Sequence, residues 1–228
     1  MNWDAVFTSL RLASLTSLIL LVLGIPLASW LAFSRWRGKF LVESVVALPL
    51  VLPPTVLGFY ILTAMGPRSP AGRWYETLIG SPLPFTFEGL VFGSVIYSLP
   101  FAIQPMANAF AAVDRSLVEV SWTLGISRLA TFFRLILPSA KNGVITALVL
   151  TFAHTMGEFG VVLMVGGNIE GVTRTVSIDI YDQVQDLNYT AASQTSLVLL
   201  VFSFTVLAIV YWLNRRSSPM FWPATRQR

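Results

Sequence analysis

The sequence contains no cysteine, one histidine and few charged residues, and each shortage excludes a class of protein. Without cysteine the chain forms neither a disulfide nor a thiolate metal site, and one histidine makes no metal site by itself. Only 11% of the 228 residues are charged, against about 25% in soluble domains, and 55% are hydrophobic. This composition predicts an integral membrane protein, with no polar stretch long enough to fold as a separate aqueous domain.

Two further absences concern energy and targeting. No GxxxxGK[ST] phosphate-binding loop occurs, so we expect neither ATP hydrolysis nor a catalytic site in this chain, and no bound metal or cofactor. The first apolar run is too long for the core of a cleavable signal peptide, and no basic segment precedes it. We therefore expect that run to stay in the membrane.

Five apolar runs are long enough to cross a bilayer, for which a helix needs about 20 residues. They are residues 8–33, 40–65, 89–113, 139–165 and 191–213. The sequence predicts an all-α, polytopic membrane protein with five transmembrane helices in a single domain, residues 1–228.

Lys and Arg are unevenly divided between the segments that join these runs. Eleven lie on one side, namely Arg35, Arg37, Lys39, Arg115, Arg128, Arg134, Lys141, Arg215, Arg216, Arg226 and Arg228. Four lie on the other, namely Arg11, Arg68, Arg73 and Arg174. Because cytoplasmic segments are enriched in these residues, we expect the N-terminus outside and the C-terminus in the cytoplasm. Residues 66–88 and 166–190 are then external loops, and the net charge of +4 needs no nucleic-acid partner.

The segment 114–138, between the third and fourth runs, is the least hydrophobic internal part of the chain. Ser116 and Glu119 have the spacing of a capping box, in which each side chain accepts a hydrogen bond from the other residue's amide. Gly125 stands where a short helix needs a left-handed closing residue. A helix of about two turns is unstable alone in water, so we expect this segment to pack against a partner.

A second short helix is expected to begin at Ser127 and to run to Leu137, with Pro138 at the join to the next run. The whole segment resembles the EAA loop of ABC importer permeases, which reads Glu-Ala-Ala, three residues, Gly, nine residues, Ile-x-Leu-Pro. The residues that match are Glu119, Gly125, Leu137 and Pro138. The residues that depart, all mildly, are Val120, Ser121 and Leu135.

The resemblance implies that this loop docks onto an ATP-hydrolysing subunit. The coupling residues it implies are Ser116, Glu119, Ser121, Gly125, Leu137 and Pro138. The alternative is an amphipathic loop that rests on lipid headgroups.

The second run is interrupted in its middle by Pro49, Pro53, Pro54 and Gly58. Each interior proline removes a backbone hydrogen bond and costs about 3 kcal/mol. Carbonyls freed at that depth are tolerated only inside protein or beside a water-lined cavity. Because transporters place their pathways at such broken helices, we predict that Pro53, Pro54 and Thr55 line the pathway; the alternative is a structural kink.

Two amides lie in the third run. Gln104 and Asn108 are four residues apart and share one helix face. Because an amide that faces lipid is costly, they face either another helix or the pathway, and both alternatives stay open.

In the fourth run, His154 and Glu158 are also four residues apart, so they have the spacing of a pair. Glu158 is the deepest carboxylate, and Gly157 and Gly160 beside it permit a neighbouring helix to approach closely. We predict that Glu158 accepts hydrogen bonds that hold an outer gate in register; the alternative is a buried structural acceptor.

Three more segments, 48–60, 98–110 and 157–168, resemble those of molybdate ABC permeases, so the resemblance covers nearly the whole chain. It implies the type I ABC importer permease fold and alternating-access import of molybdate across the bacterial inner membrane. It also implies a homodimer, two ATPase subunits that bind ATP and Mg²⁺ below it, and a periplasmic molybdate-binding protein.

Three alternatives to molybdate import stay open. Tungstate and sulfate or thiosulfate permeases share much of the pattern. A channel would not need the EAA-type loop, and a membrane scaffold would not need broken helices. Because the runs carry no Lys or Arg at depth, we expect a neutral, hydrogen-bonding pathway.

Overall fold

The computed structural model describes residues 2–215, and within them all regular structure is helical. Arg216, Arg226 and Arg228, together with the predicted cytoplasmic C-terminus, lie outside the described residues. The helices are α1 (Trp3–Phe33), α2 (Lys39–Val51), α3 (Pro54–Met65), α4 (Pro70–Ile79), α5 (Phe87–Ala111), α6 (Arg115–Thr123), α7 (Arg128–Thr131), the π-helix η1 (Phe132–Ile136), α8 (Leu137–Ser139), α9 (Lys141–Met156), α10 (Gly160–Gly166), α11 (Val176–Gln185) and α12 (Tyr189–Arg215).

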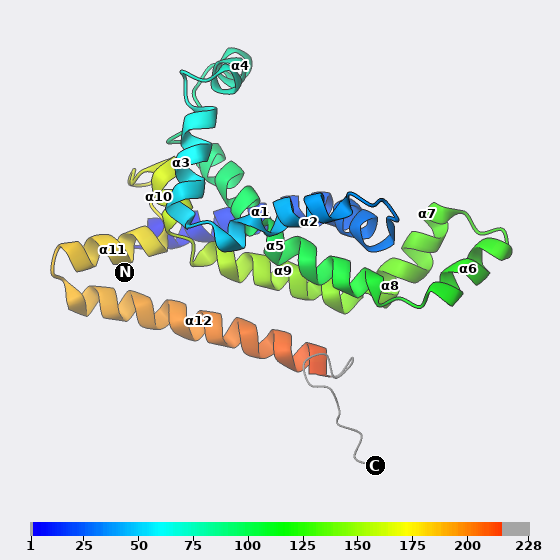
Figure 1. Cartoon of the computed structure of the whole chain (residues 1–228). Helices are drawn as coiled ribbons and strands as arrows, with labels where there is room; N and C mark the ends of the chain where they lie inside the picture. The colour runs from blue at the N-terminus through cyan, green and yellow to red at the C-terminus, as the bar shows by residue number, and fades with distance from the viewer. Residues whose placement is uncertain (1, 216–228) are drawn as a thin grey trace.

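The centre of the molecule is a bundle of α1, α5 and α9, which pack lengthwise on one another (Figure 1). The largest cluster of buried apolar residues joins these helices and includes Leu20, Ile103, Met106, Phe110 and Ala147. Small residues such as Ala13 and Ala28 are fully buried along α1, as expected where membrane helices approach closely. Helix α12 lies at the edge of this bundle and contacts it mainly through α9 and α11.

The predicted break in the second run is confirmed. Helices α2 and α3 meet at Pro53 with a bend of 113°, so α3 leaves the bundle crosswise and pairs with α10 (Figure 1). Pro53 caps α3 and Pro54 occupies its first turn, where a missing N–H costs nothing. A proline cluster therefore ends one helix and starts the next, instead of kinking a single span.

The fourth run is not one helix, although the sequence predicts a continuous span over 139–165. Helix α9 ends at Met156, and the chain turns at Gly157 before α10 begins at Gly160. Three described helices (α1, α5 and α12) are long and apolar enough to cross a membrane alone. Up to five crossings result if each bent pair, α2 with α3 and Arg128–Ser139 with α9, counts as one span.

Each of the two predicted external loops contains a helix. In α4, Ser69 accepts a hydrogen bond from the Gly72 amide at 2.8 Å, Pro70 opens the first turn, and Gly80 closes the helix at φ 84°. Serine before proline and a closing glycine are helix boundary signals that are readable in the sequence. The segment 166–190 contains α11, which the sequence analysis also missed.

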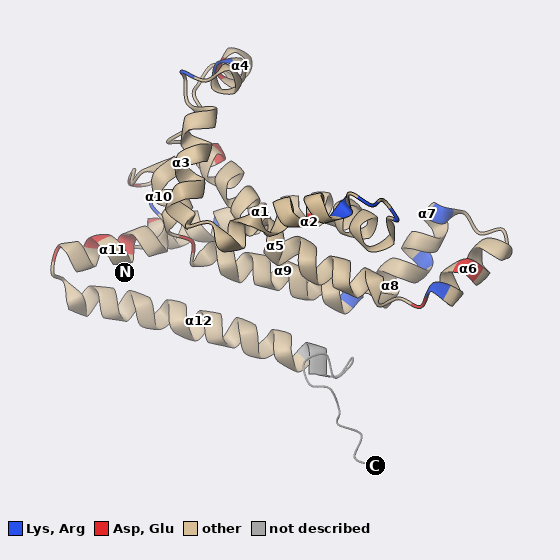
Figure 2. Cartoon of the chain, viewed as in Figure 1, with Lys and Arg blue, Asp and Glu red and all other residues tan. Residues whose placement is uncertain are grey.

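Charged residues separate along the bundle (Figure 2). Lys and Arg gather at the end that carries the α1–α2 connection and helices α6 to α8, whereas acidic residues gather around α11 at the other end. The two ends of the molecule therefore differ in charge, as the uneven distribution of Lys and Arg in the sequence predicts.

Candidate functional site: coupling hairpin and membrane cavities

We call residues 114–139, which form α6, α7, η1 and α8, the coupling hairpin, after the role that the EAA resemblance predicts for residues 114–138. The predicted capping box is wrong, because the cap of α6 is Asp114 and not Ser116. An Asp114 Oδ1 atom accepts a hydrogen bond from the Ser116 amide at 2.9 Å, and the hydrogen bonds from Ser116 lower the pKa of the Asp114 carboxyl. Aspartate caps as well as serine does, and here it starts the helix two residues earlier.

The turn after α6 matches its prediction. Gly125 has a φ of 80°, the left-handed conformation that other residues adopt only with strain. Its amide donates to the Trp122 carbonyl at 3.0 Å, and the Ile126 amide donates to the Ser121 carbonyl at 3.1 Å. These bonds satisfy carbonyls that the end of α6 would otherwise leave free.

Ser127 caps α7 as predicted, through a 3.3 Å bond from the Ala130 amide. The hydroxyl of Ser121 lies 2.9 Å from that of Thr131, and both side chains are buried. Ser121, a departure from the EAA pattern, therefore ties α6 to α7. A second hydrogen bond, to the Val118 carbonyl at 2.7 Å, fixes the same hydroxyl.

The predicted single helix from Ser127 to Leu137 is interrupted by the π-helix η1. Pro138 has no N–H to bond one turn back, and a wider turn before it accommodates that loss. The chain then bends by 70° after Ser139 into α9. Pro138 was predicted to mark the join to the next run, and the observed bend follows it by one residue.

Helix α6 has two faces with different surroundings. Arg115, Val118, Glu119 and Trp122 follow the i, i+3, i+4, i+7 pattern of one stripe and line a cavity of about 590 Å³ beside the end of α1. The opposite stripe, with Leu117, Val120 and Leu124, is apolar and exposed. An exposed apolar stripe of this kind is typical of a contact with another protein or with a membrane surface.

A second cavity, of about 530 Å³, lies where α3 and α10 meet α5 and α9. It brings together five predicted pathway residues, namely Pro54, Thr55, Gly157, Glu158 and Gly160. Tyr97 and His154 complete its polar lining. Pro53 does not line it and lies in the break beside it.

Glu158 is 3% exposed, and neither carboxylate oxygen has a hydrogen-bond partner among the described residues. Within the described residues, no hydrogen bond of normal geometry therefore supports the predicted role of Glu158 in holding a gate. His154 does not pair with it either; its ring stacks on Phe101, with centroids 3.9 Å apart. The helix ends at Gly157, between the two residues, so the four-residue spacing no longer places them on one face.

The structure separates Gln104 and Asn108 from Glu158. They line a third cavity, of about 390 Å³, between α1, α2 and α5, together with Lys39 and Glu43. Lys39 Nζ donates to the Leu31 carbonyl at 3.0 Å and pairs with Glu43 Oε1 at 3.4 Å. Lys39 was not predicted to line a cavity, because it stands at the edge of an apolar run, but its long side chain extends to the end of α1.

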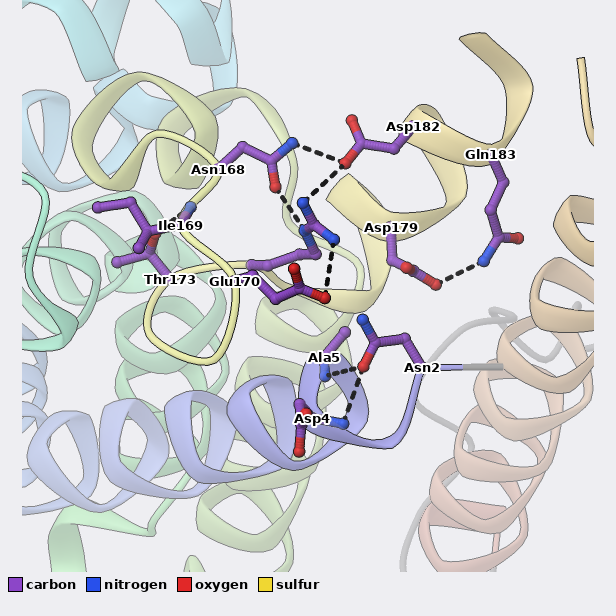
Figure 3. A network of polar contacts seen from close by, with 11 residues as sticks. Asn2, Asp4, Ala5, Asn168, Ile169, Glu170, Thr173, Asp179, Asp182 and Gln183 are labelled. Atoms are coloured by element: carbon purple, nitrogen blue, oxygen red, sulfur yellow. Dashed lines mark hydrogen bonds and ion pairs between the residues drawn. The ribbon is translucent and has the colours of Figure 1, made fainter. Parts of the chain in front are cut away.

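The far end of the molecule holds a polar network that the sequence analysis also missed (Figure 3). Arg174 Nε donates to Asn168 Oδ1 at 2.7 Å, and the guanidinium pairs with Glu170 at 3.5 Å and Asp182 at 3.7 Å. Burial raises the pKa of Asp179 nearby, and Arg174 partly opposes this shift. The network holds together the loop between α10 and α11, and thereby the end of the helix that begins at the second cavity.

Two substitutions of Glu158 distinguish the contribution of its carboxyl group from that of its side-chain volume. We expect Glu158→Gln to fold with an unchanged or higher melting temperature and to keep part of its uptake, because it keeps the size of the side chain and removes a carboxyl group whose ionised form would be buried without partners. Glu158→Ala leaves a void and should lose most uptake. Uptake and thermal unfolding test this, with Glu88→Gln at the exposed start of α5 as a surface control. Complete loss of uptake in an assembled Glu158→Gln protein would mean that the charge itself is required.

Comparison with known proteins identifies the family. The model of the family described as "binding-protein-dependent transport system inner membrane component" matches residues 24–219. The chain is 52% identical to the molybdenum transport system permease protein ModB of Azotobacter vinelandii, over 92% of this chain and 93% of that protein. It is 35% identical to ModB of Escherichia coli K12, over 95% of each. A probable sulfate transport permease of Nephroselmis olivacea is 28% identical, over 92% of this chain and 74% of that one.

Solved structures agree on the fold. A bacterial alginate ABC importer matches with a TM-score of 0.72 and 18% identity, over 96% of this chain and 79% of that one. An inward-facing MetNI methionine transporter matches with a TM-score of 0.70 and 16% identity, over 94% of each chain. The predicted type I ABC importer permease fold is thereby confirmed. The chain belongs to the family of binding-protein-dependent transport system inner membrane components.

Proposed function

We propose that this chain is the membrane-spanning subunit of an ATP-driven importer of molybdate, and not itself an enzyme. The coupling hairpin carries this proposal, because its left-handed Gly125 and exposed apolar stripe suit docking to an ATPase. A relative 52% identical over nearly its whole length and named as a molybdenum permease supports the substrate. Import of sulfate is the second candidate, supported by the more distant sulfate relative.

The partners follow from the same proposal. Two copies of the chain pair in the bacterial inner membrane, and two ATPase subunits bind ATP and Mg²⁺ on the cytoplasmic side. A periplasmic binding protein delivers the oxyanion to the other side. ATP binding draws the two coupling hairpins together and opens the pathway outward, and hydrolysis returns it to the inward-open state.

The test is reconstitution of the permease with its candidate ATPase and binding protein in nanodiscs. Binding protein loaded with molybdate is expected to raise ATP hydrolysis several-fold over unloaded protein. Equal stimulation by sulfate-loaded protein would move the assignment to the second candidate. Failure of the ATPase to co-purify with the permease would refute the importer proposal.

The orientation is tested separately by thiol labelling, which the absence of native cysteine makes clean. Thr77 on α4 and Thr123 on α6 are both exposed and make only local hydrogen bonds, so they form a matched pair. An impermeant reagent added outside should label Thr77→Cys and should reach Thr123→Cys only after permeabilisation. The reverse pattern would place the coupling hairpin outside and refute ATPase docking.

A further inference from the structure

The third cavity, between α1, α2 and α5, is the feature with the most unexplained chemistry. We propose that it is an anion subsite at which Lys39, Gln104 and Asn108 bind the transported tetrahedral oxyanion near the cytoplasmic end. Glu43 forms an ion pair with Lys39, so the anion binds by competing with the Glu43 carboxylate for the Lys39 ammonium. The inference rests on the proposed function, since it assumes that the chain carries an oxyanion.

The cavity combines donors with room for a ligand. Its polar lining consists of Lys39, Glu43, Gln104 and Asn108, and the rest is apolar, largely alanine. Since about 15 Å³ of such space already holds a water molecule, about 390 Å³ holds a small oxyanion with part of its hydration shell.

The two amides are available to a ligand. Gln104 and Asn108 are exposed on one face of α5, and neither side-chain amide has a hydrogen-bond partner among the described residues. Each amide offers two N–H donors. An amide left against hydrocarbon would be costly, so this face meets water, a ligand or a second copy of the chain.

Lys39, the first residue of α2, supplies the positive charge of this subsite. Its ammonium has three donors; the Leu31 carbonyl takes one, and Glu43 pairs with the group at 3.4 Å. The Lys39 and Glu43 side chains are 34% and 49% exposed, so water and small ions reach the pair. Because Glu43 must be displaced, binding is weak, and weak binding suits a site that an ion must leave.

A plain structural ion pair is the alternative, since Lys39 and Glu43 stand four residues apart on α2. The two explanations predict different changes in anion binding when Lys39 or Glu43 is neutralised. For a structural pair, neutralising either residue changes anion binding in the same direction, because the same interaction is lost. For an anion subsite, neutralising Lys39 weakens anion binding, whereas neutralising Glu43 strengthens it.

The experiment measures anion binding by the full-length chain in nanodiscs, without ATP, at constant ionic strength set with chloride. Molybdate is titrated while the melting temperature is followed, because a ligand that binds the folded state raises it. The midpoint is the molybdate concentration that gives half of the full rise in melting temperature. We expect Lys39→Gln to raise this midpoint about tenfold, and Glu43→Gln to lower it several-fold. The double variant Gln104→Leu, Asn108→Leu should raise the midpoint with the ion pair intact.

Lys141→Gln is the matched control, because Lys141 is the other lysine of the chain, opens α9 just after the coupling hairpin and does not line this cavity. Its midpoint should equal that of the wild type. Shifts of the same sign in Lys39→Gln and Glu43→Gln, or equal shifts in Lys39→Gln and Lys141→Gln, would overturn the subsite. Opposite shifts in a protein whose ATPase does not respond to loaded binding protein would keep the subsite and reject the importer proposal.

Discussion

Gly125→Val is expected to abolish ATPase association and uptake while the chain still inserts into the membrane. At φ 80° a valine side chain collides with its own backbone, and a non-glycine residue in such a region costs about 1–3 kcal/mol. Helix α6 has nine residues and little independent stability, so that cost is enough to release the turn. The hydrogen bonds to Trp122 and Ser121 would then be lost.

Gly80→Val is the matched control for this variant. Gly80 has a φ of 84°, and a Cβ atom at either glycine would meet nothing within 4 Å, so the two substitutions carry the same backbone strain. Gly80 ends α4, far from the coupling hairpin (Figure 1). Co-purification with the ATPase should fail for Gly125→Val alone. Normal uptake by Gly125→Val would instead favour a loop that only rests on lipid.

Gly160→Ala is expected to cause the second large loss, at the contact between α3 and α10. A Cβ atom at Gly160 would lie 2.7 Å from Pro54 Cβ and 3.3 Å from the Thr55 amide nitrogen. Both are rigid parts of the chain, so α10 must move away from α3. Overpacking of this kind costs about 1–3 kcal/mol and reshapes the cavity that contains Glu158. Uptake should fall severely and the melting temperature by several degrees.

Gly157→Ala provides the comparison, only three residues away. The nearest atom to a Cβ atom at Gly157 is 3.8 Å distant, and the substitution should leave uptake close to that of the wild type. The sequence analysis predicted that both glycines permit close approach, and the structure supports this for Gly160 alone. Equal behaviour of the two alanine variants would show that the α3–α10 contact does not limit transport.

Local chemistry accounts for what could be predicted from the sequence. The break at Pro53, the left-handed Gly125 and the cap at Ser127 each depend on one residue type in one backbone conformation. The capping box was mispredicted by the same logic, because Asp114 competes with Ser116 for the start of α6 and local rules do not rank the two.

Tertiary placement accounts for what could not be predicted. Gln104 and Asn108 were left open between a helix contact and the pathway, and Glu158 was predicted at an outer gate. The structure places the amides and Glu158 in two different cavities, because the bend after α2 and the break after α9 decide which helices meet. The position of the Lys39 side chain depends on its hydrogen bond to Leu31, eight residues earlier at the end of α1. A hydropathy pattern shows that residue 39 is charged but does not predict this contact.

Helix α9 links the coupling hairpin to the cavity that contains Glu158. It begins at Lys141, just after the bend that follows the coupling hairpin, and ends at Met156, two residues before Glu158. Its 16 residues span about 24 Å, and the backbone hydrogen bonds of the helix keep this length nearly constant. In the import cycle proposed above, a displacement of the hairpin would reach the Glu158 cavity as rigid-body movement of α9. The stiffness of this one helix would then limit how much of each ATP hydrolysis cycle becomes movement at that cavity.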